Sequence, residues 1–167
     1  MTPLTMALRF DSDQANQVSR IRVAGRITDE SLAELYETSR RYSTATRARV
    51  GIVDLTSVSK TVVSSEFIHR LAHRKPDAEN ARRDYFIVAP APHVFGLCRM
   101  FQILGEDARP FLRIVHSMDE AIAAIGVLVA PLNLQMSVPE ADIQLRGSQD
   151  VSRLGAPCLS EPKPEGF

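Results

Sequence analysis

Two adjacent serines, Ser64 and Ser65, have the residue type and the position to do chemistry in this chain. They follow a polar stretch and precede apolar residues at helical spacing over 67–72, which predicts that they open a helix. The start of a helix carries free backbone N–H groups and favours negative charge. Exposed amides and reactive oxygens would therefore meet here, although a plain helix cap remains an alternative.

Asp54 and His93 lie where a parallel sheet would place binding residues. Asp54 stands at the end of the apolar run 49–55, and His93 follows a second apolar run at 85–89. Open α/β sheets bind ligands beyond the carboxyl ends of their strands. Asp54 could equally accept a hydrogen bond from the turn that follows it. Sequence does not give spatial adjacency, so no Ser-His-Asp set is inferred and no catalytic residue is predicted.

The polar stretch 56–66 is expected to be a hydroxyl-rich loop that completes a contact surface. A protein or ligand would meet this loop together with the starts of the two helices that begin near Ser64 and Pro92. The residues of this predicted surface are Asp54, Ser57, Ser59, Lys60, Thr61, Ser65, Glu66 and His93.

The end of the Ser64 helix is basic. Its basic residues are His69, Arg70, His73, Arg74 and Lys75. These side chains either interact favourably with the helix dipole or form a docking surface for an acidic partner or an anionic lipid head group. The two histidines have the spacing of a metal pair, but no carboxylate or cysteine completes a ligand set nearby. No glycine-rich phosphate loop is present. We therefore predict no metal and no cofactor.

Composition restricts the classes of function. The chain has 167 residues, a formal net charge of zero and two cysteines without metal spacing, Cys98 and Cys158. Cys98 lies on an apolar helical face and is expected in the core. Neutral charge argues against nucleic-acid binding, and no apolar run reaches the roughly 20 residues of a membrane span. Without a signal peptide, a cytoplasmic location is expected.

The elements that must position these residues can be predicted from periodicity. Strands are expected at 6–10, 19–23, 49–55, 85–89 and 111–115. Helices are expected after Thr28, from Ser64 to near Lys75, from Pro92 to Gly105, and from Ser117 to Gly126. Residues 77–83 are expected to be a polar connector.

This order predicts an α/β fold with a mixed five-stranded sheet. An antiparallel hairpin comes first, parallel strand–helix–strand units follow, and about four helices complete the domain. The domain is expected to span 1–126. Residues 127–146 are interpreted as a segment that docks on the domain or on a second copy, and 147–167 as a disordered tail.

Several motifs in this order resemble the STAS domain, the family of anti-anti-sigma factors and of the cytoplasmic tails of sulphate transporters. The matching segments are 25–28 before the first helix, 53–58 after the central strand, 63–67 at the serines, 94–105 in the third helix and 116–121 before the last helix. The resemblance covers residues 6–126. It is greatest to small stand-alone bacterial members of the family.

The resemblance implies a role for Ser64. In signalling members, a partner kinase phosphorylates the first serine of an Asp-Ser-Ser segment, and Ser64 holds that position. The chain departs from the family pattern at Val63, where an Asp is usual, and at Glu66, where a Gly is usual. A carboxylate at Glu66 would repel a phosphate on the neighbouring serine.

The function expected from the sequence is a non-enzymatic regulatory or binding domain. Its partner would be a protein, such as an anti-sigma kinase, that contacts the 56–66 stretch in an anti-anti-sigma type of partner switching. The alternative is a module that binds a nucleotide or a lipid in the same crevice. A homodimer through the hairpin edge or through 127–134 stays open.

Overall fold

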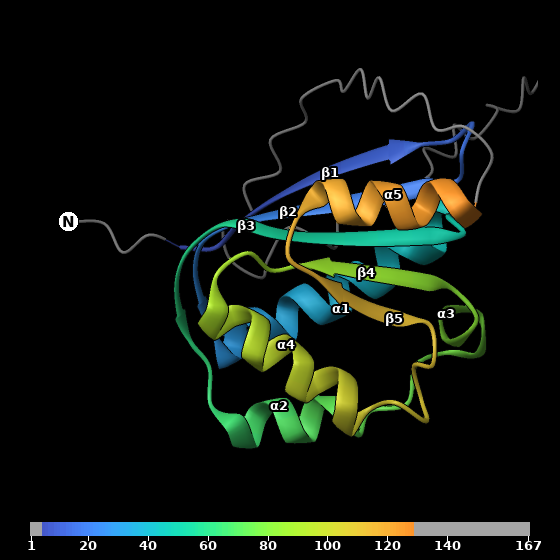
Figure 1. Ribbon diagram of the computed structural model, residues 1–167. Helices are drawn as coiled ribbons and strands as arrows, with labels where there is room; N and C mark the ends of the chain where they lie inside the picture. The colour runs from blue at the N-terminus through green and yellow to red at the C-terminus, as the bar shows by residue number, and fades with distance from the viewer. Residues whose placement is uncertain (1–4, 129–167) are drawn as a thin grey trace, which may run out of the picture.

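The computed structural model describes residues 5–128 (Figure 1). The strands are β1 Ala7–Asp13, β2 Val18–Thr28, β3 Val50–Val62, β4 Asp84–Val88 and β5 Leu112–Val115. The helices are α1 Asp29–Thr46, α2 Ser65–Ala72, α3 Ala78–Ala81, α4 Pro92–Leu104 and α5 Met118–Leu128.

The five strands form one sheet in the order β1-β2-β3-β4-β5. β1 pairs with β2 antiparallel, and the three remaining pairs are parallel. The predicted mixed sheet, with a hairpin followed by parallel units, is therefore confirmed. Because the order is sequential, each parallel strand is added beside the one before it, and the carboxyl ends of β2, β3, β4 and β5 point the same way.

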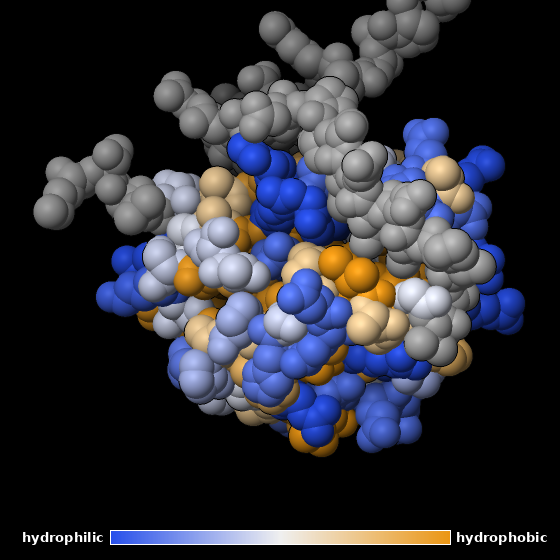
Figure 2. Space-filling view, turned by 45° about the horizontal axis from the view of Figure 1, so that its top comes forward, coloured by the Kyte–Doolittle hydropathy of each residue, from blue (hydrophilic) through white to orange (hydrophobic). Residues whose placement is uncertain are grey.

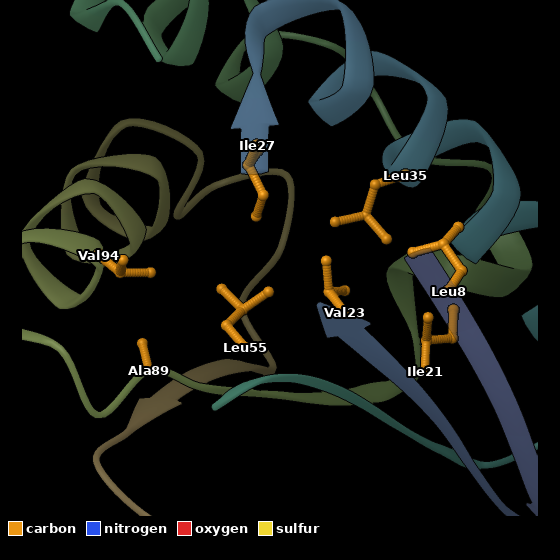
Figure 3. Close-up of a cluster of buried hydrophobic side chains, with 8 residues drawn as sticks. All are labelled: Leu8, Ile21, Val23, Ile27, Leu35, Leu55, Ala89 and Val94. Carbon is orange, nitrogen blue, oxygen red and sulfur yellow. The ribbon is translucent and has the colours of Figure 1, made fainter. Parts of the chain in front are cut away.

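Helices cover both faces of this sheet. Figure 1 shows α5 on one face and α1, α2 and α4 on the other, with α2 lying outside α4. Leu35 of α1 and Val94 of α4 enter a buried cluster with the sheet residues Val23 and Leu55 (Figure 3). A second buried cluster joins the other face to Ile125 of α5. Each fully buried side chain of this size contributes about 1.5–3 kcal/mol.

Helix α1 starts where the sequence predicts. Thr28 is its N-cap, and its hydroxyl accepts a hydrogen bond from the Ser31 N–H at 3.3 Å, while the Ser31 hydroxyl accepts one from the Thr28 N–H at 2.8 Å. The helix ends at Arg47, whose φ of 51° is left-handed and stops the helical turn.

The prediction of a polar loop over 56–66 is wrong in its first part, because β3 continues to Val62. β2 continues to Thr28, and its last residues pair in parallel with the polar second half of β3, from Ser57 to Val62. Two shifts of register accompany the pairing, on either side of Gly25. Ser57, Ser59 and Lys60 are exposed, so the stretch lacks the apolar alternation that marks a half-buried strand.

Smaller differences occur at other element ends. α2 ends at Ala72 rather than near Lys75, and α3 forms inside the predicted connector 77–83, which brings the helices of the described residues to five. α5 passes through Gly126 to Leu128 instead of ending there. A glycine is tolerated inside a helix at a modest cost, so it is a weak stop signal. The predicted docking segment 127–146 and tail 147–167 lie outside the described residues, apart from 127–128.

The surface of the described part is of mixed polarity. Figure 2 shows blue hydrophilic residues around its outline, with orange hydrophobic residues between them. The large hydrophobic residues most exposed are Val62, Ile103 and Phe111. Within residues 5–128, no helix is long and apolar enough to cross a membrane.

Candidate functional site

Ser64 caps α2 and is held by a residue from another helix. Its hydroxyl oxygen accepts a hydrogen bond from the Phe67 N–H at 3.1 Å. Its own N–H donates to Asp29 Oδ1 at 2.8 Å, and its hydroxyl donates to Asp29 Oδ2 at 2.8 Å. Asp29 is the first residue of α1. One carboxylate therefore ties the starts of α1 and α2 together.

This contact follows from the register of the sheet. β2 and β3 are parallel neighbours, and their last residues, Thr28 and Val62, lie opposite each other. The chain segments that leave the two strands consequently emerge side by side, and Asp29 and Ser64 meet. From the sequence, Asp29 is only an acidic residue in the first turn of a helix, where the helix dipole favours negative charge. The contact with Ser64 could have been found from the sequence only if the extended pairing had been foreseen.

Two acidic residues belong to the region of the Ser64 hydroxyl. The Asp29 carboxylate accepts a hydrogen bond from this hydroxyl, and Glu66 lies in the first turn of α2. The side chain of Ser64 is exposed, as are those of Ser65 and Glu66. A phosphate on Ser64 would remove the hydroxyl donor and place nearly two further negative charges beside the Asp29 carboxylate. Phosphorylation of the Ser64 hydroxyl oxygen would therefore remove its hydrogen bond to Asp29 and cause repulsion between the phosphate and the carboxylate.

Asp54 belongs to a local turn and lies away from Ser64. Its Oδ1 accepts the Thr56 N–H at 3.0 Å and the Thr56 hydroxyl at 2.5 Å, as the turn-bonding alternative predicted. Asp54 pairs with Val88, whereas Val62 pairs with the last residue of β2. Val62 lies eight residues beyond Asp54 on β3, which at ~3.3 Å per residue is about 26 Å along the strand. Asp54 and Ser64 are thus distant points rather than one site.

The other predicted surface residues divide into exposed and inward groups. Ser57, Ser59 and Lys60 are exposed along the second half of β3, and His93 is exposed in the first turn of α4. Thr61 is half-buried and is among the residues that line a cavity between the sheet and the helices.

The basic segment at and just after the end of α2 is partly engaged within the molecule. Arg74 donates to Glu37 of α1 at 2.5 Å. Desolvation raises the pKa of Glu37, but hydrogen bonds from Arg74 and Arg40 outweigh it, so the pKa lies below its usual value. The rings of His69 and His73 stack with centroids 4.5 Å apart. Residues 5–128 contain no group of three or more side chains placed to hold a metal ion.

A cavity of about 180 Å³ lies between the sheet and helices α1, α2 and α4. Most of its wall is apolar, and the side chains include Leu35, Val53, Leu71, Ile87, Leu97 and Phe101. Cys98 also lines it, and burial raises the pKa of this thiol to about 12. The thiol therefore stays protonated and unreactive, as the core prediction implied.

Three polar side chains in the cavity wall have buried atoms without a hydrogen-bond partner. These atoms are Thr61 Oγ1, Asn80 Nδ2 and Arg83 Nη1. Asn80 and Arg83 lie in and after the short helix α3, in a segment that the sequence analysis treated as connector. The sequence therefore missed both, because only the packing of α3 turns them inward.

Comparison with known proteins finds likeness only among solved structures. No protein-family model and no curated protein matches the chain. An anti-sigma factor antagonist from Mycobacterium paratuberculosis is 20% identical, with a TM-score of 0.46, over 72% of this chain and 94% of that one. The unphosphorylated anti-sigma factor antagonist SpoIIAA is 16% identical, with a TM-score of 0.48, over 71% of this chain and 96% of that one. At such values, these likenesses say nothing of what this chain binds.

Proposed function

We propose that this chain is a non-enzymatic regulatory domain that binds a protein partner through the surface around Ser64. Ser57, Ser59 and Lys60 of β3, with Ser65 and Glu66 of α2, form the remainder of that surface. The observation that carries the proposal is the exposed Ser64 hydroxyl, held at a helix start by the carboxylate of Asp29. The motif resemblance to the STAS domain supports the anti-anti-sigma type of partner switching as its specific form.

The switch would operate by charge and by loss of a donor. In the unmodified chain, Asp29 accepts both donors of Ser64 and keeps the starts of α1 and α2 together. Phosphorylation of Ser64 would remove one donor and add close to two negative charges. The N-terminus of α2 would tolerate the phosphate, because its free N–H groups favour an anion. An acidic surface on the partner would not tolerate it, and the complex would dissociate.

Co-expression with a serine-kinase partner tests this function. We expect mass spectrometry to find phosphate on Ser64 and none on the adjacent Ser65, which is the matched control position. We also expect the phosphorylated chain to bind the partner at least about tenfold more weakly, since charge repulsion at an interface costs at least about 1.4 kcal/mol. Finding neither a complex nor phosphoserine at position 64 contradicts the proposal.

Small-molecule binding is the second candidate, and the cavity is the observation that favours it. The sequence analysis placed a nucleotide or lipid in the crevice beyond the strand ends. The cavity instead lies between the sheet and the helices, and its apolar wall suits hydrocarbon better than a nucleotide. A thermal-shift screen with nucleotides and with acyl compounds separates small-molecule binding from binding of a protein partner, because a ligand that binds the folded chain raises its Tm.

A further inference from the structure

We propose that residues 132–138 form a sixth strand of the sheet, which pairs antiparallel with the outer edge of β1. This segment follows α5 and lies outside the described residues. The inference makes specific the docking that the sequence analysis expects of residues 127–146, and it does not depend on the function proposed for Ser64. Its consequence is that the hairpin edge is closed to a second copy of the chain.

β1 is an edge strand in the part of the sheet that the structure describes. It pairs with β2 in an unbroken register from Ala7 to Asp13, and the strand order places no described strand on its other side. Every second residue of such a strand directs its backbone N–H and C=O groups away from its neighbour. Native edges are often very short or interrupted by a bulge or a proline. β1 has 7 residues, no bulge and no proline, so its edge is regular enough to pair with another strand.

The segment after α5 has the sequence pattern of a half-buried strand. Apolar and polar side chains alternate along it without exception, in the order Leu132, Asn133, Leu134, Gln135, Met136, Ser137 and Val138. Strict alternation of this length predicts a strand with one buried and one polar face. Pro131 and Pro139 bound the segment, and proline is tolerated at the end of a strand but not in its middle. The segment therefore matches β1 in length and has its own stop signals.

The face on which α5 lies decides which edge of the sheet this segment joins. Helices α1, α2 and α4 belong to the connections between successive parallel strands and lie on one face, whereas α5 lies on the other (Figure 1). Connections between parallel strands of one sheet are right-handed in nearly all proteins. On the first face, such connections carry the chain from β2 toward β5. On the face of α5, a right-handed connection therefore carries the chain from β5 back toward β1, and the first open place is beyond β1.

The position and the direction of α5 suit this connection. Ile125 of α5 belongs to a buried cluster that includes Val18 of β2, the neighbour of β1. The open place beyond β1 is two strand spacings from β2, which is about 10 Å. Residues 129–131 match the roughly two to six residues that usually join a helix to the next strand. A strand that follows α5 in this way runs parallel to β5 and therefore antiparallel to β1.

The apolar side of the segment has a surface to cover at this edge. Leu8 of β1 lies in the buried cluster beneath α1, and Phe10 packs against this cluster but is only half-buried. The rings of Phe10 and Tyr42 of α1 lie 4.8 Å apart. A register with Leu134 opposite Phe10 places the apolar side of the segment on this face and its polar side on the face of Asp11. A slip of one residue would turn the apolar side outward, so the pattern selects this face.

Amide hydrogen exchange of the full chain, measured residue by residue by NMR, tests the sixth strand. An edge strand protects about every second amide, whereas a strand with two neighbours protects consecutive amides. We expect consecutive protection across β1, with each amide at least about a hundredfold slower than in the urea-unfolded chain. Alternate amides of 132–138 should be protected as well. Because the strand comes from the same chain, an approximately tenfold dilution of the protein should leave these rates unchanged.

Two variants with the same new side chain test which face of the segment is buried. Leu134→Asp places a carboxylate on the apolar side, so we expect the amides that β1 directs away from β2 to exchange at least about tenfold faster. Gln135→Asp adds the same charge on the polar side, and it should change these rates by less than about threefold. The amide of Ile52 in β3 is the reference for an intact fold in both variants, because its side chain is buried beneath α5.

Three outcomes overturn the proposal. The first is alternating protection in β1 together with no protection in 132–138. The second is protection that falls on dilution, which would assign the edge to a second copy of the chain. The third is an equal effect of Leu134→Asp and Gln135→Asp. If Leu134→Asp does not fold, the exchange pattern of the wild-type chain and its response to dilution decide the question without it.

Discussion

The Asp29 carboxylate acts as a two-point acceptor between helices that are distant in sequence. Asp29 and Ser64 are 35 positions apart, and both donors of the serine reach the carboxylate at 2.8 Å. A hydrogen bond to a charged acceptor contributes about 1.5–3 kcal/mol when protected from water and less at an exposed position. This contact is exposed, so we expect its contribution near or below the bottom of that range.

A double-mutant cycle measures this contribution. Asp29→Ala, Ser64→Ala and the double variant should give a coupling energy of about 0.5–1.5 kcal/mol in urea unfolding. Ser64→Ala alone should lower the free energy of unfolding by more than the coupling energy, because it also removes the hydroxyl oxygen that caps the Phe67 N–H. Glu30→Ala with Ser64→Ala is the control cycle, since Glu30 shares the first turn of α1. Equal coupling in both cycles would show that the effect is general electrostatics.

Cys98 gives a second test at the scale of one residue. Burial raises its pKa to about 12, so the reactive thiolate is scarce in the folded chain. We expect iodoacetamide at about pH 8 to label Cys98 at least about a hundredfold more slowly in the native chain than in urea. Peptide mass spectrometry distinguishes this thiol from that of Cys158. Similar native and unfolded rates at Cys98 would contradict its burial beside the cavity.

At the scale of elements, β1 extends further than its apolar alternation suggests. The sequence predicted a strand at 6–10, but β1 continues to Asp13. The reason is a cross-strand ion pair: Asp11 Oδ2 accepts from Arg20 Nε at 3.0 Å and from Nη2 at 2.7 Å. Asp11 faces Arg20 in the hairpin register and is fully buried at its side chain. A charged residue breaks the apolar pattern of a strand, although its partner on β2 allows the pairing to continue.

Loss of the Asp11 carboxylate should weaken the hairpin strongly. Asp11→Ala leaves the guanidinium of Arg20 largely buried without its partner, so we expect a loss of about 3 kcal/mol in urea unfolding. Asp13→Ala is the matched control on the same strand. The pKa of Asp13 is lowered by hydrogen bonds from Asn16 within the turn, and its loss should cost about 1 kcal/mol or less. Equal losses in the two variants would contradict the role given to Asp11.

At the scale of the whole molecule, the order and pairing of the strands were predictable, whereas the cavity was not. Apolar runs such as 49–55 and 85–89 mark strands wherever they pack, and the alternation with helices predicts parallel pairing. The sequence also located the Ser64 helix start. The contact of Asp29 with Ser64 depends on the long-range register of the strands. The presence of Asn80 and Arg83 in the cavity wall depends on how the short helix α3 is oriented. Local periodicity contains neither kind of information.

Amide hydrogen exchange of the chain with phosphoserine at position 64 tests the proposed switch most directly. In the unmodified chain, the Ser64 N–H is bonded to Asp29 and the Phe67 N–H to the Ser64 hydroxyl oxygen. With phosphoserine, we expect exchange at the Ser64 amide to rise at least about tenfold, because charge repulsion drives the Asp29 carboxylate away. The Phe67 amide should stay within about threefold, because the phosphate still caps α2. Unchanged protection at Ser64 would contradict the switch.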